Sequence, residues 1–243
     1  MGSDWSWGLH FSDHRPPAAV SSEFIDLARR HGLSMRNESG TVTVFGDDGD
    51  HVFITEAETP TAVAAGMRHI ALWLGEVDIF AHCQREPDQA GDGIRLSWSL
   101  DSVWCHRNPT PLADGYRHLH RRLTALWVDA AETLGALHGR VTDEWSIEQI
   151  WDMTDLMDDS MTPGQWPSWL GWWTYFGAAH VSGLPPLPLP RLQQHLQPTP
   201  SGGQILTLLV DPAAVDTIRY EQLHKVWLSS LPPPGNGDMY GMV

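Results

Sequence analysis

The sequence predicts an α+β protein in which helices pack on a mainly antiparallel sheet. Three observations lead to this class: pairs of strand-like segments, single helical segments between the pairs, and no regular βαβ alternation or internal repeat. We expect residues 1–231 to form one domain and residues 232–243 to form a flexible C-terminal tail. A division into two similar halves near residues 103–111 stays open.

The first elements are a strand and a helix. Trp5 and Trp7 indicate an irregular or edge strand in residues 1–17, which end in a Pro-Pro pair. Ser22 opens a helix with acids in its first turns and arginines in its last turn, and Gly32 follows as its stop.

A β-hairpin and a second helix follow. Residues 41–45 and 51–55 alternate between apolar and polar side chains and flank a glycine-bearing loop, which predicts an antiparallel hairpin. A Thr-Pro pair at positions 59–60 then marks a helix start. Apolar residues recur at helical spacing from there to Gly75, so we expect the helix to end at that glycine.

The middle of the chain predicts a second strand pair and a long helix. Residues 78–84 and 94–101 are strand-like and flank a loop rich in turn-forming residues. An apolar stripe predicts a helix over residues 112–134, which Gly135 ends. Residues 136–141 then form another strand.

The most aromatic segment comprises residues 166–176, with four tryptophans, a tyrosine and a phenylalanine. Gly171 and Gly177 bound a short strand in this segment, because aromatic side chains and threonine suit a half-buried sheet. Strand side chains alternate between faces, so we expect Trp172 and Phe176 to point to the same face.

Prolines follow this strand. Residues 184–190 cannot donate enough hydrogen bonds for a helix or a central strand, so we expect an extended, polyproline-like segment. It is either a ligand for a proline-binding groove or a connector that carries its leucines onto the domain, and we favour the connector. Gly202 and Gly203 then lead into a buried strand at 204–210 and a final helix.

The charge balance excludes some partners. Thirty acids face fifteen bases, giving a net charge of −15, and Lys225 is the only lysine. Such a chain is repelled by phosphate backbones, so we expect no direct nucleic-acid binding and favour a basic protein partner. Solubility alone also explains the charge. The N-terminus has no signal core and no apolar run has the length of a membrane span, so we expect a cytoplasmic protein.

The sequence contains no recognisable catalytic or cofactor motif. His118 and His120 are two apart on a predicted helix, so they face different directions and cannot share a metal ion. Cys83 and Cys105 each have a histidine neighbour but lack a second spaced pair, unlike a zinc site, and we expect both to be buried thiols. We therefore assign no catalytic residue, metal or cofactor.

An acidic segment at residues 143–159 stands out, because it holds seven acids, no base and two tryptophans. Acids beside exposed aromatic residues suit a binder of a cationic surface, since charge speeds encounter and tryptophan anchors hold the complex. The alternative is an amphipathic segment with aromatic side chains inward and acids in water. The candidate binding residues are Asp143, Glu144, Trp145, Glu148, Trp151, Asp152, Asp155, Asp158 and Asp159.

The C-terminal half resembles a known family. A strand ending in Asp-Glu-Trp145 leads through the acidic segment to Gly-Trp-Trp-Thr-Tyr-Phe176, and prolines, a Gly-Gly strand and a terminal helix follow. This order resembles the Immunity protein 52 family of bacterial polymorphic-toxin systems, most clearly over residues 136–231. The residues that carry the motif are Gly171, Trp172, Trp173, Tyr175, Gly202 and Gly203. The doubled tryptophan, the long proline run and the extra N-terminal segment depart from the family pattern.

The resemblance implies a non-catalytic immunity protein that binds a cognate toxin domain, a basic nuclease, inside the producing cell. The charge of −15 fits this partner independently. Two other hypotheses remain: a cytoplasmic hydrolase or transferase with an unrecognised acidic site, and an interaction module that uses the proline-rich segment. A neighbouring gene for a large secreted protein with a variable C-terminal domain favours the first hypothesis, whereas a deep pocket with converging carboxylates and histidines favours the second.

Overall fold

One ten-stranded sheet organises the molecule. The structure, a computed structural model, describes residues 3–12, 15–46, 49–65, 69–88, 91–154 and 161–232. The strand order is β3-β2-β4-β5-β6-β1-β7-β8-β10-β9, and neighbouring strands run antiparallel throughout, which confirms the predicted fold class. The strands are β1 (Trp5–Phe11), β2 (Val42–Phe45), β3 (His51–Ile54), β4 (His69–Leu74), β5 (Val77–Asp88), β6 (Gly91–Leu100), β7 (His138–Asp143), β8 (Trp173–Phe176), β9 (Leu196–Pro198) and β10 (Gln204–Thr207).

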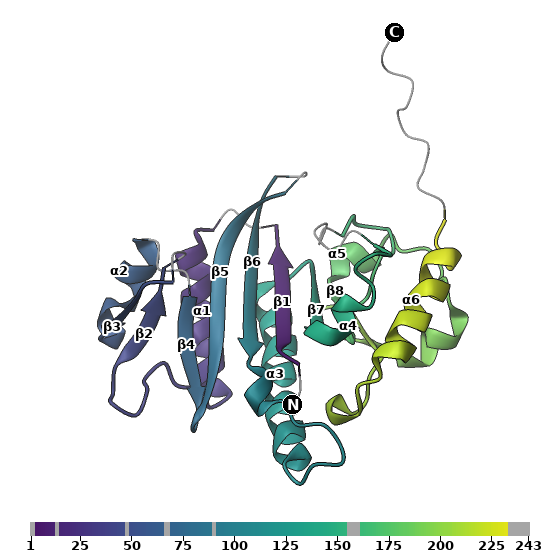
Figure 1. The fold of residues 1–243 in the computed structure, drawn as a ribbon. Helices are drawn as coiled ribbons and strands as arrows, with labels where there is room; N and C mark the ends of the chain where they lie inside the picture. The colour runs from purple at the N-terminus through teal and green to yellow at the C-terminus, as the bar shows by residue number, and fades with distance from the viewer. Residues whose placement is uncertain are drawn as a thin grey trace.

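Helices cover the sheet unevenly. Figure 1 shows α1 and α3 together behind the sheet, whereas α6 lies beside its C-terminal part. The helices are α1 (Pro17–Arg30), α2 (Thr59–Ala64), α3 (Ala113–Leu134), α4 (Glu144–Glu148), α5 (Ala178–Val181) and α6 (Thr217–Ser230). Short 3₁₀ turns occur at η1 (Glu56–Glu58), η2 (Ser102–Trp104), η3 (Pro190–His195) and η4 (Pro212–Ala214).

Tryptophans connect α1 and α3 to the sheet through hydrogen bonds and ring stacking. The indole N–H of Trp7 on β1 donates to Thr124 Oγ1 on α3 at 3.1 Å, and that of Trp127 donates to the Gly8 carbonyl at 2.9 Å. Trp98 on β6 stacks on Phe24 of α1, with ring centroids 4.9 Å apart. The indole N–H groups of Trp7 and Trp127 thus find polar partners while their rings fill the core, whereas that of Trp98 has no partner among the described residues.

The strand β8 divides its side chains between two layers. Tyr175 points to α3, where its hydroxyl donates to Glu132 Oε1 at 2.8 Å. Trp172 packs on Tyr220 of α6, with ring centroids 4.6 Å apart. Phe176 belongs with Trp227 of α6 to a second, smaller core cluster, whose buried members are Met161, Leu170, Phe176, Leu187, Leu189, Leu192, Leu206 and Trp227. Trp172 and Phe176 therefore both pack toward α6, as their predicted shared face requires, although β8 begins only at Trp173.

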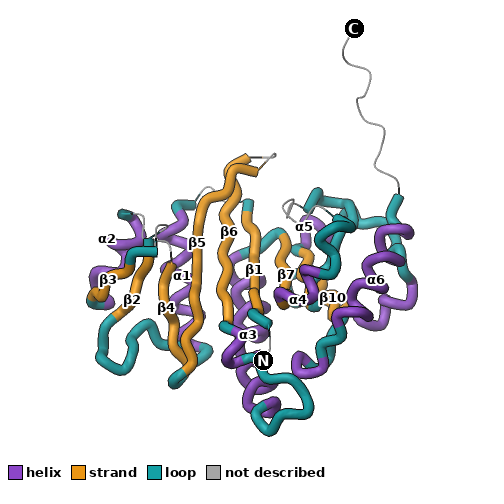
Figure 2. The backbone as a smooth tube through the Cα atoms, viewed as in Figure 1, coloured by secondary structure: helices purple, strands orange, loops and turns teal. Residues whose placement is uncertain are grey.

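The prediction of an irregular or edge strand at the N-terminus was wrong. β1 lies in the interior of the sheet, paired with β6 on one side and with β7 on the other (Figure 2). Its alternate residues Trp5, Trp7, Leu9 and Phe11 are all buried. The sheet therefore continues across residues 103–111, because β1 joins strands from both sides of that segment.

The predicted helix over residues 59–75 was also wrong in its second half. α2 ends at Ala64, and residues 69–74 form β4 between β2 and β5. A short apolar run fits either element, and the pairing with two neighbours decides for the strand. α1 also begins earlier than Ser22, at Pro17, because proline suits the first helical turn.

Several other predictions were confirmed. β2 and β3 form the predicted hairpin, and β5 and β6 form the predicted strand pair, extended toward its loop. α3 spans Ala113–Leu134, with Gly135 in the left-handed conformation at its C-terminus. The structure does not describe residues 233–243, where we expected a tail.

The proline-rich segment packs on the domain. Leu187 and Leu189 are buried in the second core cluster, and Trp166 Nε1 donates to the Pro185 and Pro186 carbonyls. These contacts support the connector interpretation. In the part of the chain that the structure describes, no helix combines the length and hydropathy of a membrane span.

Candidate partner-binding surface

The acidic segment begins at the end of a sheet strand. β7 ends at Asp143, whose Oδ1 accepts a hydrogen bond from the Ser146 backbone N–H at 3.3 Å. Asp143 thereby caps α4, because a carboxylate satisfies a free N–H group and interacts favourably with the helix N-terminus. The chain then leaves the short helix and continues in turns as far as Thr154.

Asp143 itself is inside the protein, so its assignment to a binding surface was wrong. Its side chain is 1% exposed, and it accepts hydrogen bonds from the Ser3 hydroxyl at 2.8 Å and from Trp172 Nε1 at 2.7 Å. Arg107 Nη2 lies 3.6 Å from Oδ1. Asp143 therefore holds together β7, the N-terminus and the aromatic strand. The sequence did not indicate this, because these partners are far away along the chain.

The other described members of the predicted surface are accessible. The five exposed residues are Glu144, Trp145, Glu148, Trp151 and Asp152. We refer to these five residues as the acidic aromatic surface. Ile147 is half-buried and Ile150 is completely buried, so the apolar side of this segment packs on the core while the acids face water.

Both tryptophans in this segment remain accessible. Trp145 is 37% exposed and Trp151 is 60% exposed, although large aromatic side chains usually bury most of their surface. The alternative interpretation, in which the apolar side chains of this segment point inward, therefore holds for Ile150 but fails for the two tryptophans. Arg107 lies over the Trp145 ring, with its guanidinium carbon 4.3 Å from the centroid. This contact holds one tryptophan in place before any partner binds.

The carboxylates of the acidic aromatic surface are not neutralised locally. Glu144, Glu148 and Asp152 form no ion pair with any residue in the described ranges. Their charges are therefore available to a cationic partner. Asp155, Asp158 and Asp159, which we also predicted for this surface, lie outside the described residues.

The backbone requires glycine at the three motif positions Gly171, Gly202 and Gly203. A Cβ added at Gly171 would lie 2.7 Å from the Trp173 carbonyl oxygen and 2.8 Å from that of Val141. One added at Gly203 would lie 2.7 Å from the Phe176 carbonyl oxygen, and Gly202 has a φ of 89°. These positions need glycine for close approach or for a turn. The motif therefore shapes the β8–β10 pair.

The described residues offer little support for nucleophilic or metal chemistry. Burial raises the pKa of the Cys83 thiol to about 12 and also raises the pKa of Cys105, so neither forms a ready thiolate. Among the residues with described positions, no group of three or more histidines, cysteines and acids has the geometry to hold a metal ion.

One pocket lies away from the acidic aromatic surface. It lies between α3 and residues 210–212, and Asp211 is the one carboxylate among its described lining residues. Arg117 holds that carboxylate with two hydrogen bonds of 2.9 Å, from Nε to Oδ1 and from Nη2 to Oδ2. The pair lowers the pKa of Asp211, so this acid is ionised and already engaged. The converging carboxylates expected of an acidic hydrolase are not found among these lining residues.

Comparisons of the chain with protein-family models, with curated proteins and with solved structures found no match. The resemblance to the Immunity protein 52 family therefore remains a hypothesis that rests on the order of the aromatic and Gly-Gly strands.

Proposed function

We propose that this protein is a non-catalytic immunity protein, which binds and neutralises a bacterial toxin domain through the acidic aromatic surface. The partner we propose is a nuclease with a cationic nucleic-acid cleft. One observation carries the proposal: two accessible tryptophans, Trp145 and Trp151, share a short segment with three acids that have no described ion pair.

Charge supports this choice of partner. A net charge of −15 repels nucleic acid and attracts a cleft built to bind it. Complementary charge raises the rate of encounter by factors of about 10 to 1,000 at low salt. The acids Glu144, Glu148 and Asp152 are accessible and not locally neutralised, so they contribute to this attraction.

The tryptophans supply the affinity in this proposal. Tryptophan is enriched among the residues that contribute most to protein interfaces, where truncation typically costs about 2 kcal/mol or more. Trp151 leaves 60% of its surface in water in the free protein, and that area is available for burial against a partner. A protein that neutralises a toxin by blocking its nucleic-acid cleft needs no catalytic activity of its own.

The proline-rich segment provides weaker support for an interaction module. Leu187 and Leu189 face the core, and the carbonyls of Pro185 and Pro186 accept from Trp166. The segment is therefore engaged with its own domain. The pocket on α3 has one carboxylate among its described lining residues, Asp211, which is already paired with Arg117 and so gives the hydrolase alternative no support.

Co-expression tests the proposal. The chain is produced with the C-terminal domain of a secreted protein from a neighbouring gene, the partner that the proposal requires, and we expect the two to co-purify and the cells to survive toxin production. Trp151→Ala should weaken binding about 30-fold, which corresponds to about 2 kcal/mol. The matched control is Phe53→Ala, because Phe53 is similarly accessible at 61% but lies on β3.

Two results would contradict the proposal. The first is survival without a complex between the two proteins. The second is a complex in which Trp151→Ala and Phe53→Ala, both folded by circular dichroism, bind as tightly as the natural chain.

A further inference from the structure

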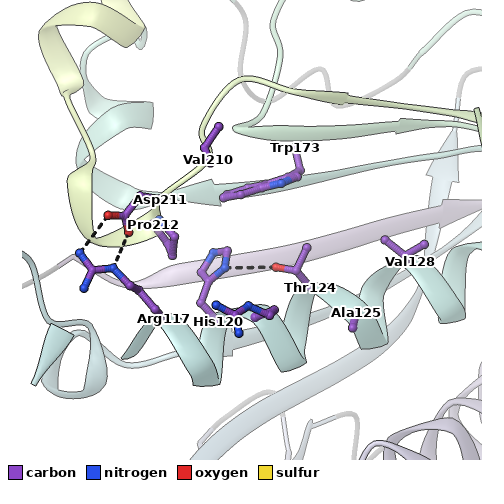
Figure 3. A pocket seen from close by; sticks show the side chains of 10 residues that line it. Arg117, His120, Thr124, Ala125, Val128, Trp173, Val210, Asp211 and Pro212 are labelled. Atoms are coloured by element: carbon purple, nitrogen blue, oxygen red, sulfur yellow. Dashed lines mark hydrogen bonds and ion pairs between the residues drawn. The ribbon is translucent and has the colours of Figure 1, made fainter. Parts of the chain in front are cut away.

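A pocket on α3 has the features of a ligand site. Its volume is about 460 Å³, within the range of small-molecule sites. Figure 3 shows Trp173 and Pro212 above it and Thr124, Ala125 and Val128 below it along the helix. The walls are largely apolar, so the pocket suits a ligand with a flat, apolar body.

A chain of hydrogen bonds from Trp7 through Thr124 reaches His120 at the floor of this pocket and favours one tautomer of its imidazole. Trp7 Nε1 donates to Thr124 Oγ1 at 3.1 Å, so the Thr124 hydroxyl proton is free to be donated elsewhere. The acceptor is His120 Nδ1, 3.2 Å away, and no other acceptor for this hydroxyl occurs among the described residues. Burial lowers the pKa of His120 to about 3, so the imidazole is neutral. We assign its proton to Nε2, because this tautomer lets Nδ1 accept from the Thr124 hydroxyl.

That Nε2–H group lacks a hydrogen-bond acceptor in the part of the chain that the structure describes. His120 is 2% exposed, and Nε2 has no hydrogen-bond partner among the described residues. Trp5 lies edge-to-face with the imidazole at 4.5 Å, but an aromatic face is only a weak acceptor. An unsatisfied buried donor is unfavourable and uncommon. Figure 3 shows the imidazole directed from α3 toward the space below Trp173 and Pro212.

The lining of the pocket includes a cation that has no partner among the described residues. Arg121 is exposed, lines the pocket and makes no ion pair or hydrogen bond with any described residue. Arg117, by contrast, is held by Asp211, Asp114 and Asn108. An unpaired arginine beside an apolar hollow favours a ligand that is both apolar and anionic.

We propose that this pocket binds a small aromatic carboxylate. The ring of the ligand lies against Trp173 and Pro212, and its carboxylate pairs with Arg121. A second acceptor atom on the ligand takes the hydrogen bond from His120 Nε2. This site goes beyond the proposed immunity function, because it is built from α3 and residues 210–212 rather than from the acidic aromatic surface.

Ligand-observed and protein-observed NMR test the proposal with benzoate, 4-hydroxybenzoate and indole-3-acetate, each beside its neutral amide. We expect at least one acid to bind with a Kd of about 1 mM or tighter. The acid should bind about ten-fold more tightly than its amide, because a charge-assisted pair with arginine is lost. The Nε2–H resonance of His120 should shift on binding.

Matched variants locate the site. Arg121→Gln should remove the preference for acid over amide, whereas Arg30→Gln, at another exposed arginine without a described ion pair, should keep it. His120→Phe should abolish the advantage of ligands with a second acceptor. Thr124→Val removes the hydroxyl that donates to His120 Nδ1, and so tests whether this hydrogen bond sets the His120 tautomer. The proposal is overturned if no acid in the panel binds, if Arg121→Gln binds as the natural chain does, or if a crystal grown with the ligand shows only water in the pocket.

Discussion

Replacing Asp143 with alanine should destabilise the protein strongly. The side chain is 1% exposed and accepts hydrogen bonds from Ser3, Ser146 and Trp172, with the Arg107 guanidinium 3.6 Å away. Hydrogen bonds to a charged group contribute about 1.5–3 kcal/mol each. Two terms reduce that total: Trp172 Nε1 keeps a second acceptor in Ser146 Oγ at 3.1 Å, and the carboxylate no longer has to be desolvated.

The expected loss in the free energy of unfolding is therefore about 3 kcal/mol, at the lower end of the range for breaking a buried charged pair. For a chain of 243 residues, this corresponds to a fall in Tm of about 6 °C. Urea titrations followed by circular dichroism measure the loss directly. Asp143→Asn should also destabilise, because its amide group directs a donor at a donor.

The matched control is Glu144→Ala, since Glu144 is the next residue, is exposed and has no described ion pair. It should change the free energy of unfolding by less than about 0.5 kcal/mol. A loss below about 1 kcal/mol for Asp143→Ala would refute the role assigned to this carboxylate, since that is within the range of ordinary substitutions.

Two further predictions concern the core. Gly171→Ala should destabilise the protein by about 1–3 kcal/mol, because the added Cβ would meet two backbone carbonyl oxygens. Gly115→Ala should stabilise it by about 0.5–1 kcal/mol, because Gly115 lies on α3 with open space around the added Cβ. Thermal melts in which both variants change Tm in the same direction would contradict this. Burial lowers the pKa of His120 to about 3 and of His224 to about 4, below their ordinary value of 6.5. Between those pKa values and pH 6.5, the unfolded chain binds more protons than the folded chain. The contribution of each histidine to stability should therefore be full above pH 6.5 and fall by about 1.4 kcal/mol per pH unit as the pH decreases. Urea titrations at pH 7 and pH 5 that give equal free energies of unfolding would disprove this.

The sequence predicted the elements whose signals are local. The hairpin of β2 and β3 has clear alternation around a glycine-bearing loop, and α3 has an apolar stripe that ends at Gly135. Residues 69–74 were misread because a short apolar run fits a helix as well as a strand until its neighbours are known.

Features that depend on contacts between distant parts of the sequence were harder to predict. The interior position of β1 depends on pairing with β6 and β7, which are far away along the chain. Asp143 was assigned to the surface together with the other acids of its segment, because its partner Ser3, 140 residues away, cannot be recognised from the sequence. His120 was considered as a metal ligand or as an ordinary surface or core histidine, because its contact with Thr124, which in turn accepts from Trp7 on another element, depends on the fold. The exposure of Trp151 was predicted as one of two alternatives, and the structure decides between them.

The most direct test of the central claim is the association rate between this protein and its proposed partner, a toxin domain from a neighbouring gene, measured by stopped-flow fluorescence over a series of salt concentrations. The double variant Glu144→Gln/Glu148→Gln removes two charges from the acidic aromatic surface, and Glu38→Gln/Glu76→Gln removes the same two units of charge from exposed positions elsewhere. We predict that the first variant associates several-fold more slowly at low salt and with a weaker salt dependence, while the second stays close to the natural chain. Equal association rates for the two folded variants would contradict the account.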